Sequence, residues 1–354
     1  MKKINFIELL RFLSSLAVIL AHYMHFFNPF NFNSNLKIFK NYLVFEEKYL
    51  PFYEILEYFY RFGYYGVYFF WEISGFVLAY TYLNKKNLNF KIFAINRFSR
   101  LYPLHLFSLI LIAVLQTSTL SIFNEELINV NEFYNGSNNF KDFLAHIFFI
   151  SGWFESTKLS FNFPVWSVSI EIIVYFIFFF VIINIKKKIF NYIIIFSIFF
   201  ILEKNNINIF FLECGKYFFN GVLIYLVINR IEKNSYIIII SLFLLIFSII
   251  GNFKSLLFFS SIILIALYLD KEIKNNFTNK FSLLGNLTYS SYLLHIPIQI
   301  LIIIIFNFFN INSTIFTKSY FFISYILLVY IISHYSYKNI ELPFKMLIRK
   351  SFIK

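Results

Sequence analysis

Long runs of apolar residues, separated by short polar stretches, recur along the whole chain. A run of about 17 to 25 apolar residues is long enough for one helix to cross the hydrocarbon core of a bilayer. The pattern predicts about ten such helices, of which those starting at 189 and 256 are short. The predicted spans are 5–27, 64–83, 101–120, 165–185, 189–203, 212–230, 235–251, 256–270, 287–309 and 318–338. We therefore expect an all-α fold, a polytopic membrane helical bundle.

One further apolar segment, 141–153, is too short to cross the bilayer comfortably. We expect it to be re-entrant from the outer side or to lie in the membrane interface. The polar stretches between the runs contain no long hydrophilic segment. We therefore expect a single membrane domain over 1–354, with no appended soluble domain.

The composition agrees with a membrane protein, because 59% of the residues are hydrophobic and only 14% are charged. Soluble globular proteins carry about 25% charged residues, so a soluble globular enzyme is excluded, and so is a disordered chain. A net charge of +13 would suggest nucleic-acid binding in a soluble protein. In a membrane protein it marks the loops that face the cytoplasm, so we expect no nucleic-acid partner.

The basic residues fall mostly on one side of the predicted spans. With the N-terminus inside and 141–153 not crossing, the inner segments carry 20 basic and 4 acidic residues, and the outer segments 9 basic and 11 acidic. If 141–153 crossed, the three lysines at 186–188 would lie outside, against the positive-inside rule. We therefore expect both termini in the cytoplasm.

Charged and titratable residues inside an apolar run cost free energy in the membrane and mark candidate functional positions. Arg11 and His22 are eleven residues apart in the first run, about three helical turns plus 20°, so they share one helix face. Histidine suits proton transfer near neutral pH, although a buried histidine that only hydrogen-bonds a neighbouring helix is the alternative. His25 follows one turn later, but no carboxylate or cysteine accompanies the pair on this helix, so we expect no metal site.

Two of the acidic residues in or near predicted spans are candidate functional positions. Glu72 needs a partner if it is charged, and Arg11 is one candidate. Ser74 and Gly75 follow it, and small residues of this kind allow helices to approach closely. Glu171 lies near the outer start of the fourth span, where it is either a site residue or an interfacial carboxylate that reaches water.

Arg97 and Arg100 are one helical turn apart, just before the predicted third span. Guanidinium groups bind phosphate through paired hydrogen bonds, so these residues are candidates for an anionic ligand. The alternative is that they only anchor the chain at the cytoplasmic surface or bind anionic lipid.

Six short motifs occur in order from the first span to the C-terminus. They are Arg11 with His22, Phe69-Phe70 with Ser74-Gly75-Phe76, Arg97-Phe98-Ser99-Arg100-Leu101-Tyr102-Pro103, Trp166-Ser167-Val168-Ser169-Ile170-Glu171, Leu284-Gly285 with Tyr289-Ser290-Ser291-Tyr292-Leu293-Leu294-His295-Ile296-Pro297, and Ile340-Glu341-Leu342-Pro343-Phe344. Over nearly the whole chain they resemble the signature segments of the bacterial acyltransferase-3 family of integral-membrane O-acyltransferases. Two positions depart from the family pattern: Glu72 stands where an apolar residue is frequent, and Ile172 stands where a second acidic residue is common.

The resemblance implies a bacterial inner-membrane enzyme that moves an acyl group, usually acetyl, from cytoplasmic acyl-CoA to a hydroxyl of a cell-surface or lipid-linked glycan. It implies that Arg97 and Arg100 bind the donor. It also implies that His22, Arg11 and Glu171 are catalytic. Glu72, as a carboxylate within an apolar run, and Ser74, as a hydrogen-bond donor, complete the expected catalytic set. Some relatives carry a soluble domain that completes transfer, so any helper of this chain is expected to be a separate extracytoplasmic protein.

The chemistry of His22 stays open at this stage. The histidine either acts as general base on the acceptor hydroxyl or carries the acyl group as an acyl-imidazole. Arg11 either orients the donor or balances Glu72. A serine nucleophile is not expected, because no Ser-His-acid constellation is evident. The identity of the acceptor glycan and of the acyl group also stays open.

Two other functions suit a polytopic chain. A transporter or flippase for a glycan or glycolipid would have sparse buried charge too, but it usually shows inverted repeats and paired broken helices, which the sequence lacks. A structural membrane protein without chemistry would leave the shared face of Arg11 and His22 unexplained.

Overall fold

The computed structural model describes residues 4–27, 47–85, 87–122, 138–154, 160–185, 188–205, 210–251, 254–273 and 278–353. These residues form helices, turns and irregular segments, and no strand occurs among them. They divide into two compact units. Unit 1 comprises 1–16, 64–94 and 170–288, and unit 2 comprises 17–63, 95–169 and 289–354.

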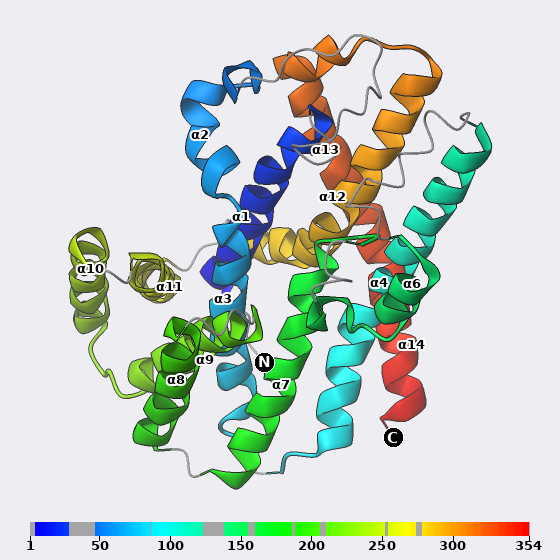
Figure 1. Cartoon of the computed structure of the whole chain (residues 1–354). Helices are drawn as coiled ribbons and strands as arrows, with labels where there is room; N and C mark the ends of the chain where they lie inside the picture. Colours follow the sequence, from blue (N-terminus) through cyan, green and yellow to red (C-terminus); the bar gives the residue numbers. More distant parts are fainter. Residues whose placement is uncertain are drawn as a thin grey trace. The chain divides into compact units, whose positions relative to one another are not determined.

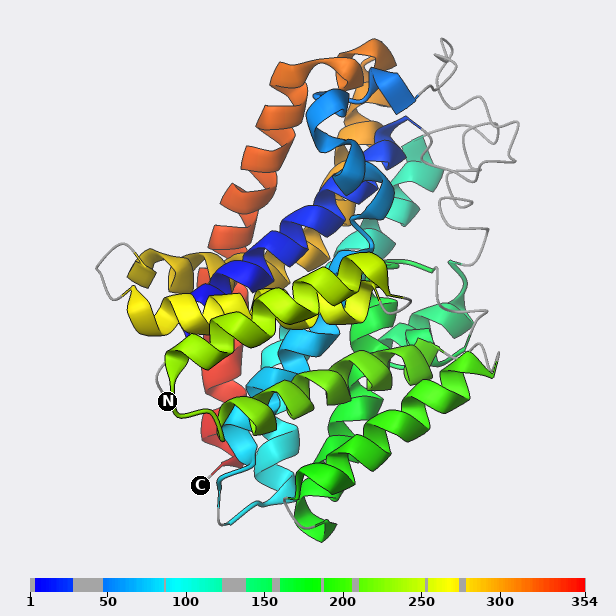
Figure 2. The ribbon, with the colours of Figure 1, turned by 90° about the vertical axis from the view of Figure 1, so that its left-hand side faces the viewer.

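Unit 1 is built mainly from five helices. They are α3 (Tyr65–Tyr82), α8 (Ile189–Lys204), α9 (Phe210–Ile228), α10 (Asn234–Ile250) and α11 (Lys254–Glu272). Helix α9 packs against both α3 and α8, and α10 packs along α11 (Figure 1 and Figure 2). The starts of α1 (Asn5–His22), α4 (Phe90–Ile122) and α12 (Phe281–Phe308) and most of α7 (Val165–Asn184) also belong to this unit.

Glycines bring α3 and α9 into close contact in unit 1. A Cβ atom at Gly75 would lie 1.8 Å from the carbonyl oxygen of Phe218, and one at Gly221 would lie 1.9 Å from that of Glu72. Neither site has room for a side chain, so the two backbones touch directly. Close approach through small residues is a common way for membrane helices to associate, and it agrees with the interpretation of Ser74-Gly75.

Unit 2 contains α2 (Tyr53–Phe62), α6 (Phe140–Ile147), α13 (Ser319–Ser336), α14 (Leu342–Phe352) and the larger parts of α4 and α12. Helix α1 ends here at His22 and continues as a 3₁₀ turn, η1 (Tyr23–Phe26). The rings of Tyr23 and Phe26 are fully buried against Phe316 and Tyr325, and the Tyr23 hydroxyl donates to the carbonyl of Phe316 (2.8 Å). This aromatic cluster fixes the chain just after His22.

Each of the ten predicted spans coincides with a helix. Within the part of the chain that the structure describes, six helices are long and apolar enough to cross a membrane, at Asn5–Phe26, Phe90–Ser118, Val165–Asn184, Phe210–Ile228, Phe281–Phe306 and Ser319–Phe352. The other four, α3, α8, α10 and α11, lie where the sequence predicts spans but do not reach that threshold. The chain is thus a polytopic helical membrane bundle.

Two predicted helix boundaries are wrong. Helix α4 begins at Phe90 rather than at 101 and continues through Pro103, and α12 begins at Phe281 rather than at 287. The apolar window locates the part of a helix that suits hydrocarbon, whereas the helix itself continues into its polar flank. Arg97 and Arg100 consequently lie inside α4 and not ahead of it.

The segment 141–153 forms α6, a turn and the 3₁₀ helix η4 (Ser151–Trp153). Asn139 caps α6 by accepting a hydrogen bond from the backbone N–H of Asp142 (3.0 Å). A helix of 8 residues is about 12 Å long, far less than the thickness of a bilayer. This length agrees with a segment that does not cross.

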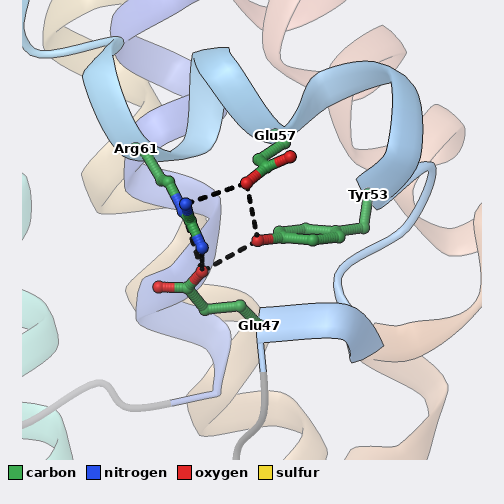
Figure 3. A network of polar contacts seen from close by, with 4 residues as sticks. All are labelled: Glu47, Tyr53, Glu57 and Arg61. Carbon is green, nitrogen blue, oxygen red and sulfur yellow. Dashed lines mark hydrogen bonds and ion pairs between the residues drawn. The ribbon is translucent and has the colours of Figure 1, made fainter.

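Polar side chains tie α2 to the preceding turn η2 (Glu47–Tyr49). Arg61 pairs with Glu57 (2.8 Å) and with Glu47 (2.7 Å), and the Tyr53 hydroxyl donates to Glu47 (2.9 Å), as Figure 3 shows. The hydrogen bond from Arg61 lowers the pKa of Glu47, which keeps this carboxylate charged at neutral pH. Because exposed ion pairs add little stability, the network mainly orients α2.

Candidate active site

His22 lies at the end of α1, in unit 2, and its ring pairs with a second histidine. Its Nδ1 is 2.8 Å from Nε2 of His295 on α12, and the two rings are nearly parallel, with an interplanar angle of 10°. His22 is partly exposed, whereas His295 is fully buried. Of the two, His22 is therefore the residue with exposed surface in this structure.

The hydrogen-bond partners of the two rings determine which nitrogen of each ring carries the proton. Nδ1 of His295 lies 3.2 Å from the carbonyl oxygen of Ser291, which can only accept, so Nδ1 carries the proton. The His295 ring is fully buried, and no carboxylate among the described residues contacts it, so it is neutral and its Nε2 is an acceptor. Nδ1 of His22 therefore donates to His295. This leaves the lone pair of His22 on Nε2, where a base or nucleophile needs it.

Two further side chains hold the backbone of the pair. Nε2 of Gln299, one turn after His295 on α12, donates to the carbonyl oxygen of His22 (2.8 Å). The Tyr325 hydroxyl donates to the carbonyl of His295 (3.3 Å). The first bond satisfies a carbonyl at the end of α1 that the helix leaves open. Both residues therefore help to fix the backbone positions of His22 and His295.

Phe163 covers one side of the histidines. Its ring centroid is 4.9 Å from that of His22 and 5.6 Å from that of His25. Among the described residues no group of three His, Cys, Asp or Glu side chains is placed to hold a metal ion. The expected absence of a metal site from the His22 and His25 pair stays a prediction.

Asn162, next to Phe163, supplies a hydrogen bond that the backbone of α12 lacks. Pro297 has no N–H, so the carbonyl of Leu293 four residues earlier loses its helical partner. Nδ2 of Asn162 donates to that carbonyl (2.9 Å) and also to Oγ of Ser108 on α4 (3.0 Å). The amide thus links α4 and α12 beside the histidine pair.

Arg97 and Arg100 are both partly exposed on α4. Arg97, Arg100 and Arg349 all lie close enough to Lys345 on α14 for their charges to act on its ammonium group. The four residues are therefore treated as one cationic group. The acidic member of the group is Glu341, which accepts a hydrogen bond from Ser290 (3.0 Å). The result is a cationic group to which α4 and α14 both contribute.

The other predicted catalytic residues lie in unit 1. Arg11 pairs with Glu8 on its own helix (3.0 Å), and the suggested pairing of Arg11 with Glu72 is wrong. Oε1 of Glu72, fully buried, instead accepts from Nδ2 of Asn220 and from Oγ of Ser260, both at 2.8 Å. Two neutral donors therefore take the place of the expected cation, and they connect α3 with α9 and α11.

Ser74 and Glu171 complete the predicted set. The Ser74 hydroxyl is 3.5 Å from that of Tyr175, a long contact between α3 and α7 within unit 1. Glu171 is buried, with 8% of its surface exposed, which does not agree with an interfacial carboxylate in open water. Of the five predicted catalytic residues, only His22 belongs to unit 2, together with Arg97 and Arg100.

Sequence reasoning missed three residues of this site as members: His295, Asn162 and Lys345. His295 had a usable signal, because it is a titratable residue within an apolar run and within one of the six motifs. Asn162 and Lys345 had none, since a single asparagine or a tail lysine is common in any chain.

Comparison with known proteins places the chain in a family. No curated protein and no solved structure matches the chain. The family model of an acyltransferase domain matches residues 4–337, which is nearly the whole chain. The chain therefore belongs to the acyltransferase-3 family, as a multi-pass membrane protein with an acyltransferase domain.

Proposed function

We propose that this membrane acyltransferase moves an acyl group, usually acetyl, from cytoplasmic acyl-CoA to a hydroxyl of a cell-surface or lipid-linked glycan. The observation that carries the proposal is the histidine pair, in which His22 Nδ1 donates to buried His295 and Nε2 keeps its lone pair. An acyltransferase needs such a group to activate a hydroxyl or to carry the acyl group.

Either form of the chemistry uses Nε2 of His22. As general base, it takes the proton of the acceptor hydroxyl while the hydroxyl oxygen attacks the thioester carbonyl. The new C–O bond forms, the C–S bond breaks, and the sulfur of CoA leaves with the proton that His22 received. As nucleophile, Nε2 instead displaces the CoA thiolate and forms an acyl-imidazole, from which the acceptor hydroxyl then takes the acyl group.

His295 is a positioning residue in this proposal. Its Nε2 accepts from His22 and holds the tautomer in which Nε2 of His22 is free. When His22 takes up a proton, the bond between the two rings becomes charge-assisted and stronger. The pair thereby stabilises protonated His22 more than a lone histidine without this acceptor would be stabilised.

The donor site in this proposal is the cationic group of Arg97, Arg100, Lys345 and Arg349. Acyl-CoA carries several phosphates, which guanidinium and ammonium groups bind. Both basic segments, around 84–100 and in the C-terminal tail, lie on the predicted cytoplasmic side, where acyl-CoA is made.

We extend the proposal to the residues and helices that stay untested. Arg11, Ser74 and Glu171 remain in the proposed catalytic set on the strength of their motifs. Glu72 remains in it as a carboxylate buried within an apolar helix. Helices α3, α8, α10 and α11 cross the membrane together with the six long spans, in a bacterial inner membrane with both termini in the cytoplasm. A separate extracytoplasmic protein completes delivery to the final glycan.

The test is mass spectrometry of surface glycans from cells with and without the gene, complemented by variants. His22→Ala should abolish the O-acyl groups while the protein still accumulates in the membrane. His334→Ala, an exposed histidine on α13, is the matched control and should restore them fully. An active His22→Ala protein, or unchanged O-acylation without the gene, would overturn the proposal.

A further inference from the structure

Asn162 has an amide oxygen without a partner, in a place where such an atom is costly. The side chain is fully buried. Its two N–H groups donate to Leu293 O and Ser108 Oγ, and the proton of Ser108 is committed to the carbonyl of His105 (2.9 Å). A carbonyl oxygen can only accept, so the amide cannot be turned round. Oδ1 is therefore a buried acceptor that no described residue satisfies.

Two histidines that are connected to Asn162 through Ser108 also have a buried acceptor atom without a donor. Nε2 of His105 on α4 donates to the carbonyl of His146 (2.7 Å), and Nε2 of His146 donates to that of Ser160 (3.0 Å). Burial lowers the pKa of His146 to about 3, so its ring is neutral. In both rings Nδ1 then keeps a lone pair, and neither Nδ1 has a donor among the described residues.

The unsatisfied atoms of this cluster, Asn162 Oδ1, His105 Nδ1 and His146 Nδ1, are all acceptors. Whatever binds them must supply hydrogen-bond donors. The phosphates of CoA supply acceptors instead, whereas a sugar presents several hydroxyl donors. The chemistry of the cluster therefore fits the acceptor substrate and not the phosphate end of the donor.

The cluster adjoins the proposed reacting group. Phe163, the next residue after Asn162, packs its ring on His22, and Leu293 is two residues before His295 on α12. The residue before Asn162, Phe161, has a φ of 45°, in the left-handed region that a bulky residue rarely occupies. Strain of this kind clusters at functional sites, and here it lies directly before Asn162.

We propose that Asn162 binds the acceptor: its Oδ1 accepts a hydrogen bond from a sugar hydroxyl next to the one that is acylated, with His105 and His146 accepting from further hydroxyls. Asn162 thereby determines which polyhydroxylated acceptor is used. This inference rests on the proposed function, since it concerns the acceptor side of the same site.

The experiment uses the full chain in native membranes, acetyl-CoA, and a panel of octyl hexosides together with their singly deoxygenated analogues. In the wild type, removal of one particular hydroxyl should lower kcat/KM about tenfold, the size of one hydrogen bond. Asn162→Ala should lower kcat/KM for the parent hexoside to the same level and lose no more with that analogue. The KM for acetyl-CoA should stay unchanged. Asn205→Ala, which removes an exposed amide that also donates to a helix carbonyl, should retain wild-type values.

The outcomes separate this inference from the function on which it rests. If the wild type acylates a hexoside but discriminates against none of its deoxy analogues, Asn162 has only a structural role, whatever the variant does. If Asn162→Ala keeps the wild-type preference among the analogues, the inference is equally wrong. If the wild type acylates no hexoside at all, the proposed sugar acceptor itself fails.

Discussion

At the scale of single residues, the buried ring of His295 determines which nitrogen of His22 keeps its lone pair, and this is the nitrogen that reacts in the proposed mechanism. His295→Ala removes the acceptor that holds the His22 tautomer, so we expect kcat to fall about 10²-fold, within the range that general-base catalysis contributes. KM for both substrates should change little, because His295 is buried behind His22. Steady-state kinetics of membrane preparations measure this separation of kcat from KM.

The matched variant is His295→Gln, which retains an acceptor atom and should recover part of the lost kcat. A purely structural role for His295 would instead show as reduced protein in the membrane with kcat per molecule unchanged. Recovery by glutamine together with normal accumulation distinguishes the two roles.

Single residues also show how far one sequence can lead. His22 could be found because a titratable side chain in an apolar run is costly and because Arg11 shares its helix face. Asn162 could not be found, since its partner Leu293 is 131 residues away and the need for it arises from Pro297, four residues after Leu293 on α12. The predicted partner of Glu72 was wrong for a related reason. The neutral side chains of Asn220 and Ser260 donate to its carboxylate, and no pattern in the sequence around Glu72 indicates them.

At the scale of elements, the contact of α3 with α9 depends on two positions that have no room for a side chain. Gly221→Ala places a methyl group against the backbone of Glu72, so the helices must separate. We expect a loss of about 1–3 kcal/mol, as in other overpacked cores, seen as a lower midpoint of thermal unfolding in detergent. Gly251→Ala, whose Cβ would meet the Phe247 carbonyl of the preceding helix end at 2.9 Å, should cost less. Equal losses for both variants would contradict this account of the α3–α9 contact.

Elements were predicted better than their ends. Each of the ten apolar runs coincides with a helix, because a helix that crosses the hydrocarbon core of a bilayer needs a long run of apolar residues. They misplaced the start of α4 because helix hydrogen bonding continues through polar residues such as Asn96 and Arg97. Pro103 lies more than a turn inside α4, so a proline near the edge of an apolar run did not mark the helix end here.

At the scale of the whole molecule, the basic residues lie mostly on one predicted side of the membrane. The inner side carries 20 basic and 4 acidic residues, and the outer side carries 9 basic and 11 acidic residues. If the cationic group of Arg97, Arg100, Lys345 and Arg349 binds acyl-CoA, the donor must arrive from that same side. Acetyl-CoA does not cross membranes, so it should support acetylation when added to inside-out vesicles and not when added to right-side-out vesicles.

Arg100→Ala and Lys345→Ala should each raise the KM for acetyl-CoA about tenfold, since each removes one charged contact to phosphate. Arg230→Ala, which removes an exposed inner-side cation outside the group, should leave the KM unchanged. Acetylation in right-side-out vesicles alone would reverse the orientation, and an equal effect of all three substitutions would reduce the role of the cations to general attraction of an anion to a basic surface.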